Sequence, residues 1–270
     1  MAHPLALTGE RTLPGVPGEE YWYARHEAAY RWIAATYADR LGGAVVVEAG
    51  SGEGYGAELL RAAGARLVVA LEYDEAAVAH AGSAYPRVVT ARANLAALPL
   101  GRASVDVLVS LQVVEHLWDL RGFLRDCAAV LCPGGLLVVT TPNRPVFSPG
   151  LARGAKPLNP FHVEELDAEQ RGDLLVSSGF TDVELLGVHH GERILAWERT
   201  HGSLVAAQLA VHTPAPDVTG GVVVSGAGKP PHDQLLADGL GLFVASVTPA
   251  DFRVGVAEGA QDLVAVAVRP

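Results

Sequence analysis

The stretch that decides the fold runs from Val45 to Leu60 and reads VVVEAGSGEGYGAELL. Its branched apolar start is typical of a strand buried in a parallel sheet. Four alternating glycines, from Gly50 to Gly56, then indicate a turn in which a ligand can approach bare backbone. The residues after the turn read as the start of a helix. The order of strand, glycine turn and helix predicts a small-molecule site at the turn.

The chain outside this stretch repeats the alternation of apolar runs and helix-like segments. Branched runs bounded by turn signals lie in RLVVALEYD, VVTARAN, SVDVLVSLQ, GGLLVVTTPN, FTDVELLGV and DLVAVAVRP. Such runs read as buried strands, and the pieces between them as crossover helices. We therefore predict an α/β fold, a doubly wound Rossmann-like sheet with helices on both faces.

The length of 270 residues predicts one domain with four parts. They are an N-terminal helical cap over 1–40, a cofactor-binding core over 41–188, an insertion or lid over 189–260, and a final strand over 261–270. The insertion contains a predicted helix, SLVAAQLAV, and a turn rich in proline and glycine, TPAPDVTGG. The proline-rich stretch TPNRPVFSPGLARGAKPLNPFH is long enough to predict a lid or binding loop.

The composition excludes several classes of partner. A net charge of −10 argues against nucleic acid, because binding phosphates requires a positive face. No apolar run approaches the roughly 20 residues of a membrane helix, and the N-terminus lacks a signal pattern. Cys127 and Cys132 match no zinc or redox motif and are expected to be reduced packing residues. We expect a cytoplasmic monomer or homodimer.

Three ligand classes use glycine turns of this kind: nucleoside triphosphates, dinucleotides and S-adenosylmethionine. A P-loop requires Lys followed by Ser or Thr after its last glycine, and this turn has neither. The dinucleotide pattern fits from Gly52 onward, so an NAD site stays open. Glu48 favours S-adenosylmethionine, because its carboxylate would repel a pyrophosphate but suits a cationic amino group. The alternative role of Glu48 is to anchor the helix N-terminus. Glu72 follows after about 20 residues and predicts a ribose contact with either cofactor.

The chain resembles the class I S-adenosylmethionine-dependent methyltransferases over nearly its whole length. EAGSGEGYG is similar to their first motif, VALEYD to their acidic second strand, and ARANLAALPL to the loop that touches adenine, where many members carry Asp and this chain has Asn94. VDVLVSLQVVEHLWD and LCPGGLLVVTTPNR are similar to their fourth and fifth strands. The resemblance implies a seven-stranded sheet with an antiparallel last strand. The residues expected to bind the cofactor are Arg25 (at the methionine carboxylate), Glu48, Gly50, Ser51, Gly52, Gly54, Tyr55, Glu72, Tyr73, Ala93, Asn94, Leu95, Leu111 and Gln112.

A narrower resemblance concerns the acceptor. LTGERTLPG, EYWYARHEAAY, VEHLWD, TPNRPVFSPG and NPFH are similar to an actinobacterial group of methyltransferases associated with methylglucose lipopolysaccharide. This resemblance implies methyl transfer to a hydroxyl of a sugar or polysaccharide of the methylglucose or methylmannose type.

The candidate catalytic residues follow the fourth and fifth strands, where ligands bind in open α/β sheets. His116 is the first choice for the general base, since imidazole titrates near neutral pH. A helical segment would bring Gln112, Glu115 and His116 to one face. This spacing resembles quinone-biosynthesis O-methyltransferases, which bind a divalent metal there, so Mg²⁺ is a candidate cofactor. Alternatively, Glu115 and His116 only pin the helix.

Further residues are candidates for contact with the acceptor. His162 lies at the end of the proline-rich stretch, where it acts as a base or donor, or else caps the next helix. Asn143 and Arg144 are predicted to bind acceptor hydroxyls. Other functions stay open: methylation of a small natural product or quinone-like phenol, an NAD(P)-dependent sugar oxidoreductase, and a silent cofactor-binding subunit.

Overall fold

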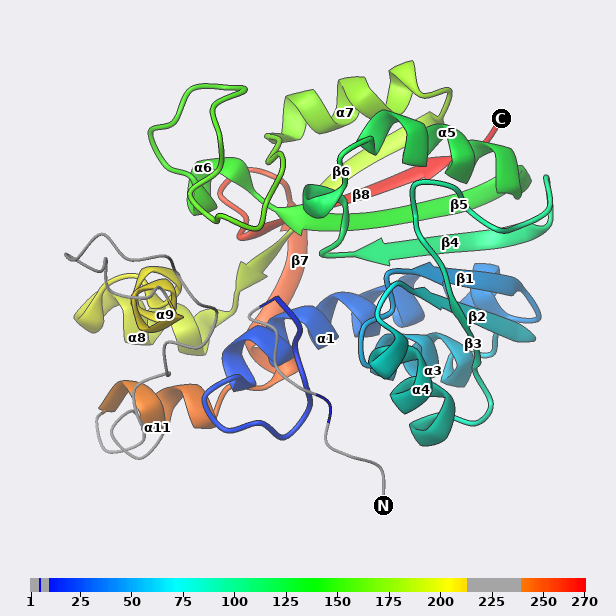
Figure 1. The fold of residues 1–270 in the computed structure, drawn as a ribbon. Helices are drawn as coiled ribbons and strands as arrows, with labels where there is room; N and C mark the ends of the chain where they lie inside the picture. Colours follow the sequence, from blue (N-terminus) through cyan, green and yellow to red (C-terminus); the bar gives the residue numbers. More distant parts are fainter. Residues whose placement is uncertain (1–4, 6–9, 213–238) are drawn as a thin grey trace, which may run out of the picture.

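The computed structural model describes residue 5, residues 10–212 and residues 239–270 (Figure 1). Two helices come first, and strands then alternate with helices. In chain order the elements are α1 (Glu20–Thr36), α2 (Ala38–Leu41), β1 (Val45–Ala49), α3 (Tyr55–Ala62), β2 (Leu67–Glu72), α4 (Glu75–Ala84), β3 (Val89–Arg92), β4 (Val105–Leu111), the 3₁₀ turn η1 (Val114–His116), α5 (Leu120–Val130), β5 (Leu131–Pro142), α6 (Arg144–Phe147), α7 (Ala168–Ser177), β6 (Thr181–His190), α8 (Glu192–His201), α9 (Leu204–His212), α11 (Gly239–Ala245), the 3₁₀ turn η2 (Pro249–Asp251), β7 (Phe252–Val256) and β8 (Asp262–Val268).

The strands form one sheet in the order β3-β2-β1-β4-β5-β8-β6-β7. Strands β1 to β5 pair in parallel, whereas β8 lies between β5 and β6 and is antiparallel to both. The predicted doubly wound fold is confirmed, but the sheet has eight strands where seven were expected. The additional strand, β7, pairs with β6 and lies within the predicted insertion. Its sequence signal is weak because only Phe252 of its five residues is buried.

Local sequence signals explain several element boundaries. Asp74, Asp119 and Asp167 cap the N-termini of α4, α5 and α7, each accepting a hydrogen bond from a backbone N–H of the first turn. Gln170 completes a capping box with Asp167. These caps fix where each crossover helix begins, and therefore how long each loop at the carboxyl ends of the strands can be.

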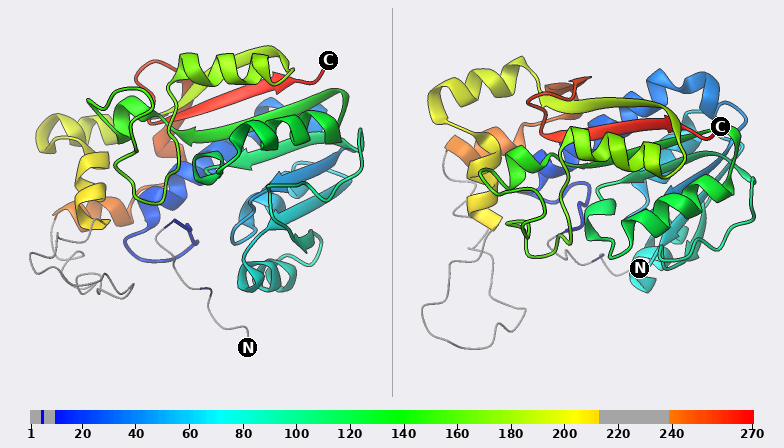
Figure 2. Two further views of the ribbon diagram at one scale, coloured as in Figure 1. Left: turned by 45° about the horizontal axis from the view of Figure 1, so that its top comes forward. Right: turned by 90° about the horizontal axis from the view of Figure 1, so that it is seen from above.

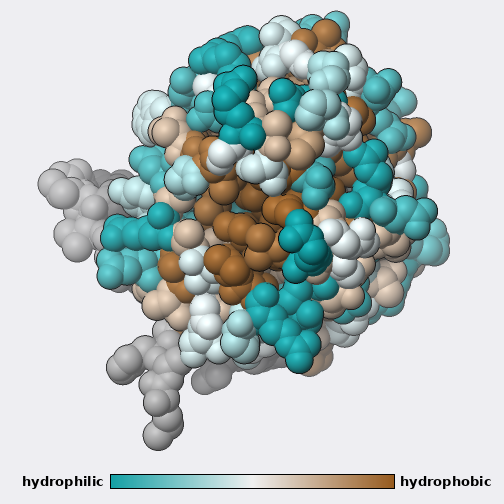
Figure 3. All heavy atoms as spheres, turned by 90° about the vertical axis from the view of Figure 1, so that its right-hand side faces the viewer, coloured by the Kyte–Doolittle hydropathy of each residue, from teal (hydrophilic) through white to brown (hydrophobic). Residues whose placement is uncertain are grey.

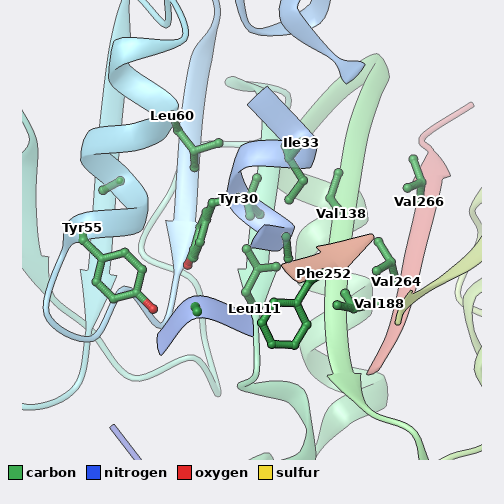
Figure 4. Close-up of a cluster of buried hydrophobic side chains, with 14 of the residues drawn as sticks. Tyr30, Ile33, Tyr55, Leu60, Leu111, Val138, Val188, Phe252, Val264 and Val266 are labelled. Atoms are coloured by element: carbon green, nitrogen blue, oxygen red, sulfur yellow. The ribbon is translucent and has the colours of Figure 1, made fainter. Parts of the chain in front are cut away.

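Helices cover both faces of the sheet (Figure 2). Side chains of α1 and α3 form one hydrophobic core with β1, β4 and β5, and those of α5 and α7 form the other. In the first core, Tyr30 and Ile33 of α1 pack near Leu60 of α3 and Val138 of β5 (Figure 4). Because both faces are covered, the loops at the carboxyl ends of the parallel strands are where a ligand is expected.

In the predicted insertion, the described residues form α8, α9, α11, η2 and β7, and they follow a β6 that continues to His190. The predicted SLVAAQLAV helix is α9, whereas the TPAPDVTGG turn lies outside the described residues. Arg193 of α8 binds Asp251 of η2 through two hydrogen bonds of 2.6 and 2.7 Å, which ties the start of this region to its end. The three helices lie on the side toward which β4 and β5 point (Figure 1).

The opposite side of the molecule, where the parallel strands begin, has a partly hydrophobic surface. Figure 3 shows a hydrophobic area in the middle of this face, surrounded by polar side chains. Among the described helices, none is both long and apolar enough to cross a bilayer.

Candidate active site

The glycine turn after β1 is held against the end of β2. The N–H groups of Gly50 and Ser51 both donate to the carbonyl of Leu71, at 2.8 and 3.0 Å. Gly50 has a φ of +84°, and a Cβ there would lie 2.4 Å from the side chain of Val113. Only glycine therefore fits this position. The turn keeps its backbone at the crevice, as the sequence predicts.

Glu72 joins the glycine turn to the residues after β2. Its Oε2 accepts a 2.8 Å hydrogen bond from the N–H of Gly52, and its Oε1 accepts from the N–H groups of Tyr73 and Asp74, at 2.9 and 3.0 Å. The carboxylate is thus fixed at the turn with one lone pair, on Oε2, left over for a ribose hydroxyl. The next side chain, Tyr73, is 66% exposed and offers an aromatic face at the same edge.

The segment after β3 lies next to Glu72. The N–H of Ala93 donates to the carbonyl of Glu72 at 2.8 Å, and the side chains of Ala93 and Leu95 are buried. Asn94 is exposed between them, and its Oδ1 accepts from the N–H of Ala96 at 2.9 Å. The structure therefore brings together three predicted cofactor segments: the glycine turn, the end of β2 and the loop after β3.

Glu48 is completely buried, although the sequence suggested a position in or beside the crevice. Its Oε1 accepts a short hydrogen bond from the hydroxyl of Tyr30. Burial raises the pKa of Glu48 to about 8, because the charged form loses its hydration, while bonds from Tyr30 and Ala57 oppose the change. Its Oε2 is buried without a hydrogen-bond partner. This geometry gives Glu48 an anchoring role inside the fold, between α1 and the start of α3.

The side chain of Tyr55, at the start of α3, contacts α1 and the segment that precedes α1. Its hydroxyl lies 2.5 Å from Nδ1 of His26 in α1 and 2.9 Å from Oγ1 of Thr12. Thr12 belongs to residues 10–13, which we call the N-terminal strap. In the same strap, Arg11 forms a 2.6 Å ion pair with Asp74, directly after β2. The strap therefore binds two of the segments that surround the predicted cofactor site.

The residues after β4 differ from the predicted helix. Only Val114–His116 form a 3₁₀ turn, and Gln112 precedes it with a φ of +55°. The Nε2 of Gln112 donates to Oγ1 of Thr140 at 3.2 Å. The prediction that Gln112 shares a helix face with Glu115 and His116 is wrong, because a helix cannot contain this backbone conformation. Leu111, the last residue of β4, is buried.

Glu115 points into the protein interior and is 1% exposed. It accepts a 3.1 Å hydrogen bond from Oγ1 of Thr141, and burial raises its pKa. The guanidinium of Arg171 is buried nearby: burial lowers the pKa of Arg171, and the charge of Glu115 opposes this change. The backbone carbonyl of Glu115 accepts from the N–H of Val163 at 2.7 Å. Glu115 thus holds the loop that contains His162.

His116 and His162 lie side by side, with ring centroids 5.0 Å apart. Both Nε2 atoms are 3.6 Å from the same oxygen, Oε2 of Glu10 in the strap. Nδ1 of His116 bonds the carbonyl of Phe161 at 3.1 Å, and Nδ1 of His162 lies 2.6 Å from Oε1 of Glu165. The alternative that His162 caps a helix is wrong, because the next helix, α7, begins six residues later with Asp167 as its cap.

The charge of His162 follows from its neighbours. Burial disfavours the protonated ring, but hydrogen bonds to Glu10 and Glu165 outweigh it and raise the pKa of His162 to about 9. The pKa of Glu10 is lowered: burial opposes its charged form, and contacts with His162, Asn159 and His116 outweigh that effect. Glu10 and Glu165 therefore stabilise a positive charge at His162.

Three other residues predicted to contact a ligand, Arg25, Asn143 and Arg144, form bonds within the fold instead. Nε of Arg25 lies 3.1 Å from Oδ2 of Asp262 in β8, and its guanidinium packs over the rings of Trp22 and Phe147. In the sheet, β4 and β5 separate β8 from β1, so this position does not favour a contact with the methionine carboxylate. Asn143 donates to the carbonyl of Ala260 at 2.8 Å.

Arg144, the other residue predicted to bind acceptor hydroxyls, is buried in the proline-rich loop. It donates to the carbonyls of Glu165, Ala152 and Ala155, at 3.2, 2.6 and 3.0 Å. These bonds tie the loop to the end of β5. Its role here is structural, because both of its terminal NH2 groups donate to backbone carbonyls.

Comparison with known proteins identifies the family. A model of the methyltransferase domain matches residues 47–139, from β1 to β5. A protein of Mycobacterium tuberculosis named "probable S-adenosylmethionine-dependent methyltransferase" is 47% identical, over 98% of this chain and 90% of its own length. The chain belongs to the S-adenosylmethionine-dependent methyltransferases. Its cofactor is therefore S-adenosylmethionine, and the chain is an enzyme. A relative in Mycolicibacterium smegmatis with the same description is 46% identical over 98% of this chain and 96% of its own length.

More distant proteins share the fold of this methyltransferase. An S-adenosylmethionine-dependent methyltransferase structure from Thermotoga maritima aligns with a TM-score of 0.58 at 16% identity, covering 93% of this chain and 94% of that one. One from Mesorhizobium loti aligns with a TM-score of 0.56 at 18% identity, covering 90% and 99%. A ubiquinone biosynthesis O-methyltransferase of Methylocella silvestris is 35% identical over 116 residues, which are 42% of this chain and 45% of that protein.

Sequence reasoning missed the residues that complete the site of this methyltransferase. Glu10 and the rest of the strap lie more than a hundred residues before His116, and no spacing rule connects such distant positions. Glu165 had a weaker signal, since it follows His162 by three residues. Asn159 was part of the NPFH motif, and its Nδ2 contacts both Glu10 and His162.

Proposed function

We propose that this methyltransferase transfers the methyl group of S-adenosylmethionine to a hydroxyl of a sugar, oligosaccharide or polysaccharide. The observation that carries the proposal is the surface around His116 and His162. Trp118 is 91% exposed two residues after His116, and Phe161 is 57% exposed beside His162. Exposed aromatic faces suit the apolar faces of sugar rings, and the polar His116, Asn159 and Glu10 suit their hydroxyls.

The cofactor is proposed to lie along the carboxyl ends of β1 to β4. Glu72 would accept a hydrogen bond from a ribose hydroxyl, while the segment Ala93–Leu95 and Tyr73 would border the adenine. The backbone of Gly50–Gly54 would border the methionine moiety. The methyl group would then point toward the residues after β4.

Methyl transfer to a hydroxyl is an in-line displacement, so oxygen, methyl carbon and sulfur must be aligned with the reacting atoms about 3 Å apart. A sugar hydroxyl is a weak nucleophile, and a base beside the oxygen accelerates the reaction. Of the two histidines, His116 is the more exposed, with 29% of its side chain accessible against 4% for His162. His116 is therefore placed to meet the acceptor, and a role as base requires that its Nε2 be free.

Labelled methyl transfer tests the proposed acceptor. The full chain is incubated with methyl-labelled S-adenosylmethionine and, in parallel, with gluco- and manno-oligosaccharides or catechol-type phenols. We expect label on the saccharides, and a higher KM with a smaller change in kcat for Trp118→Ala and Phe161→Ala. Leu242→Ala is the matched control, since Leu242 is 66% exposed on α11. Label on phenols alone would refute the proposal that the acceptor is a saccharide.

A phenolic acceptor is the second candidate. It is favoured by the partial match to the ubiquinone biosynthesis O-methyltransferase, which covers 42% of this chain. The same panel decides between the two acceptors, and binding of S-adenosylhomocysteine by calorimetry provides an acceptor-independent check of the cofactor site.

A further inference from the structure

Three side chains from distant parts of the sequence meet at the acceptor end of the site. Glu10 comes from the N-terminal strap, His116 from the turn after β4, and His162 from the loop before α7. One ligand-type atom from each lies within 4.8 Å of the other two, and among the residues that the structure describes no other group of this kind was found. The set differs from the Gln112, Glu115 and His116 set suggested by the sequence and shares only His116 with it.

The spacing of the three side chains suits a single ion. Oε2 of Glu10 is 3.6 Å from each Nε2, close to the separation of about 3.0–3.5 Å that metal–ligand bonds of about 2.1 Å impose on neighbouring ligands. For these two pairs the shift needed is a few tenths of an ångström, and the ligand atoms of the two histidines lie within 4.8 Å of each other. In the structure, Nδ2 of Asn159 lies 3.2 Å from Oε1 of Glu10 and 3.0 Å from Nε2 of His162, so this amide would have to release His162 when an ion binds.

The surroundings orient both imidazoles toward the same point. The Nδ1–H of His116 is directed at the carbonyl of Phe161, and the Nδ1–H of His162 at the buried carboxylate of Glu165. A ring that donates from Nδ1 presents its Nε2 lone pair to a ligand. Histidines that bind metals almost always donate their other nitrogen to a carboxylate or carbonyl in this way. These two Nδ1–H hydrogen bonds support a metal site independently of the distances among the three ligand atoms.

We propose that Glu10, His116 and His162 bind one divalent transition-metal ion. Two imidazoles and one carboxylate favour ions such as Zn²⁺, Co²⁺ or Fe²⁺, whereas Mg²⁺ prefers oxygen ligands. The ion would fix the strap to the residues after β4, because Glu10 is the strap's ligand. Its presence at the acceptor end would occupy Nε2 of His116, so that His116 would hold the ion and not remove the proton of the acceptor; this last consequence rests on the proposed function.

Metal titration of the full chain tests the site directly. After treatment with a chelator and dialysis, the protein is titrated with Zn²⁺ and Mg²⁺ by calorimetry, and with Co²⁺ by visible absorption. We expect one Zn²⁺ or Co²⁺ per chain, and binding of Mg²⁺ at least 100-fold weaker. Glu10→Gln and His162→Gln should each weaken Zn²⁺ binding about 100-fold, and Glu165→Gln about 10-fold.

The controls separate this site from adventitious binding and from the proposed function. His201→Gln removes an exposed histidine of α8 and should leave Zn²⁺ affinity unchanged. Affinity for S-adenosylhomocysteine, measured on each variant, reports whether the fold and the cofactor site are intact. Absence of a stoichiometric site, or Zn²⁺ binding that survives both Glu10→Gln and His162→Gln, would overturn the proposal. Metal binding without transfer to any saccharide would refute only the acceptor.

Discussion

At the scale of single residues, the carboxylates near the glycine turn divide into two kinds. Glu72 is tied to backbone N–H groups at the crevice, whereas Glu48 is buried and bonded to Tyr30. The sequence predicted both as cofactor contacts from their places at strand ends. It could not distinguish them, because burial of Glu48 depends on α1, which precedes the sheet and packs over it only in the folded chain.

Glu72→Ala should weaken the affinity for S-adenosylhomocysteine at least 10-fold, because the ribose would lose its acceptor and the turn would lose the bond to Gly52. Calorimetry measures the change. Glu75→Ala is the control, since Glu75 is an exposed carboxylate that pairs with Arg92 on the surface. An unchanged affinity in Glu72→Ala would contradict the assignment of Glu72.

Glu48→Gln should flatten the dependence of stability on pH. The folded protein keeps a proton on Glu48 up to about pH 8, whereas the unfolded carboxyl loses it near 4.5. The wild type therefore loses stability as the pH rises through this window, by on the order of 3 kcal/mol from this group. Denaturation in urea at pH 5 and pH 8 measures the difference. Equal pH dependence in both proteins would show that Glu48 is ionised in the fold.

At the scale of elements, the regular strands and helices were predictable, and the connections were not. The strands β1 to β5 follow from runs of branched residues, and α9 from its own apolar run. A helical segment after β4 was one possibility, because the sequence has helical spacing there but no local signal for the positive φ of Gln112. The pairing of the strap with His116 and His162 depends on tertiary contacts alone.

Arg144→Met should loosen the proline-rich loop. It would leave three carbonyls without their donor, and we expect a loss of about 1–3 kcal/mol of stability and faster proteolysis between residues 150 and 160. Arg153→Met in the same loop is the matched control. Arg153 is half exposed and pairs with Asp167 and Glu169, so its loss should cost less than about 1 kcal/mol. Similar effects of both variants would contradict the clamp assigned to Arg144.

At the scale of the whole molecule, the strands of the predicted core and the predicted final strand belong to one sheet. The doubly wound architecture was predictable because buried parallel strands have a distinctive composition. The position of β7 at the edge was not, because four of its five residues are partly or fully exposed. The central place of β8, between β5 and β6, follows in the sequence only from the family resemblance.

Val264→Ala should therefore cost about 2 kcal/mol, since Val264 is fully buried in β8 between two neighbouring strands. Val256→Ala, at the 71% exposed end of β7, should change stability by less than about 0.5 kcal/mol. Equilibrium unfolding in urea compares the two variants. A cost for Val256→Ala as large as that for Val264→Ala would contradict the assignment of β7 as a peripheral strand.

The place of β8 also has a consequence for synthesis of the chain. It follows every other strand in the sequence, yet it separates β5 from β6 in the sheet. While the ribosome is still making the residues before 262, β5 and β6 have no strand between them, and each presents an unpaired edge. Such edges are templates for aggregation. A nascent chain that stalls in the segment between β6 and β8 should therefore depend on a chaperone more than one that has released residue 268.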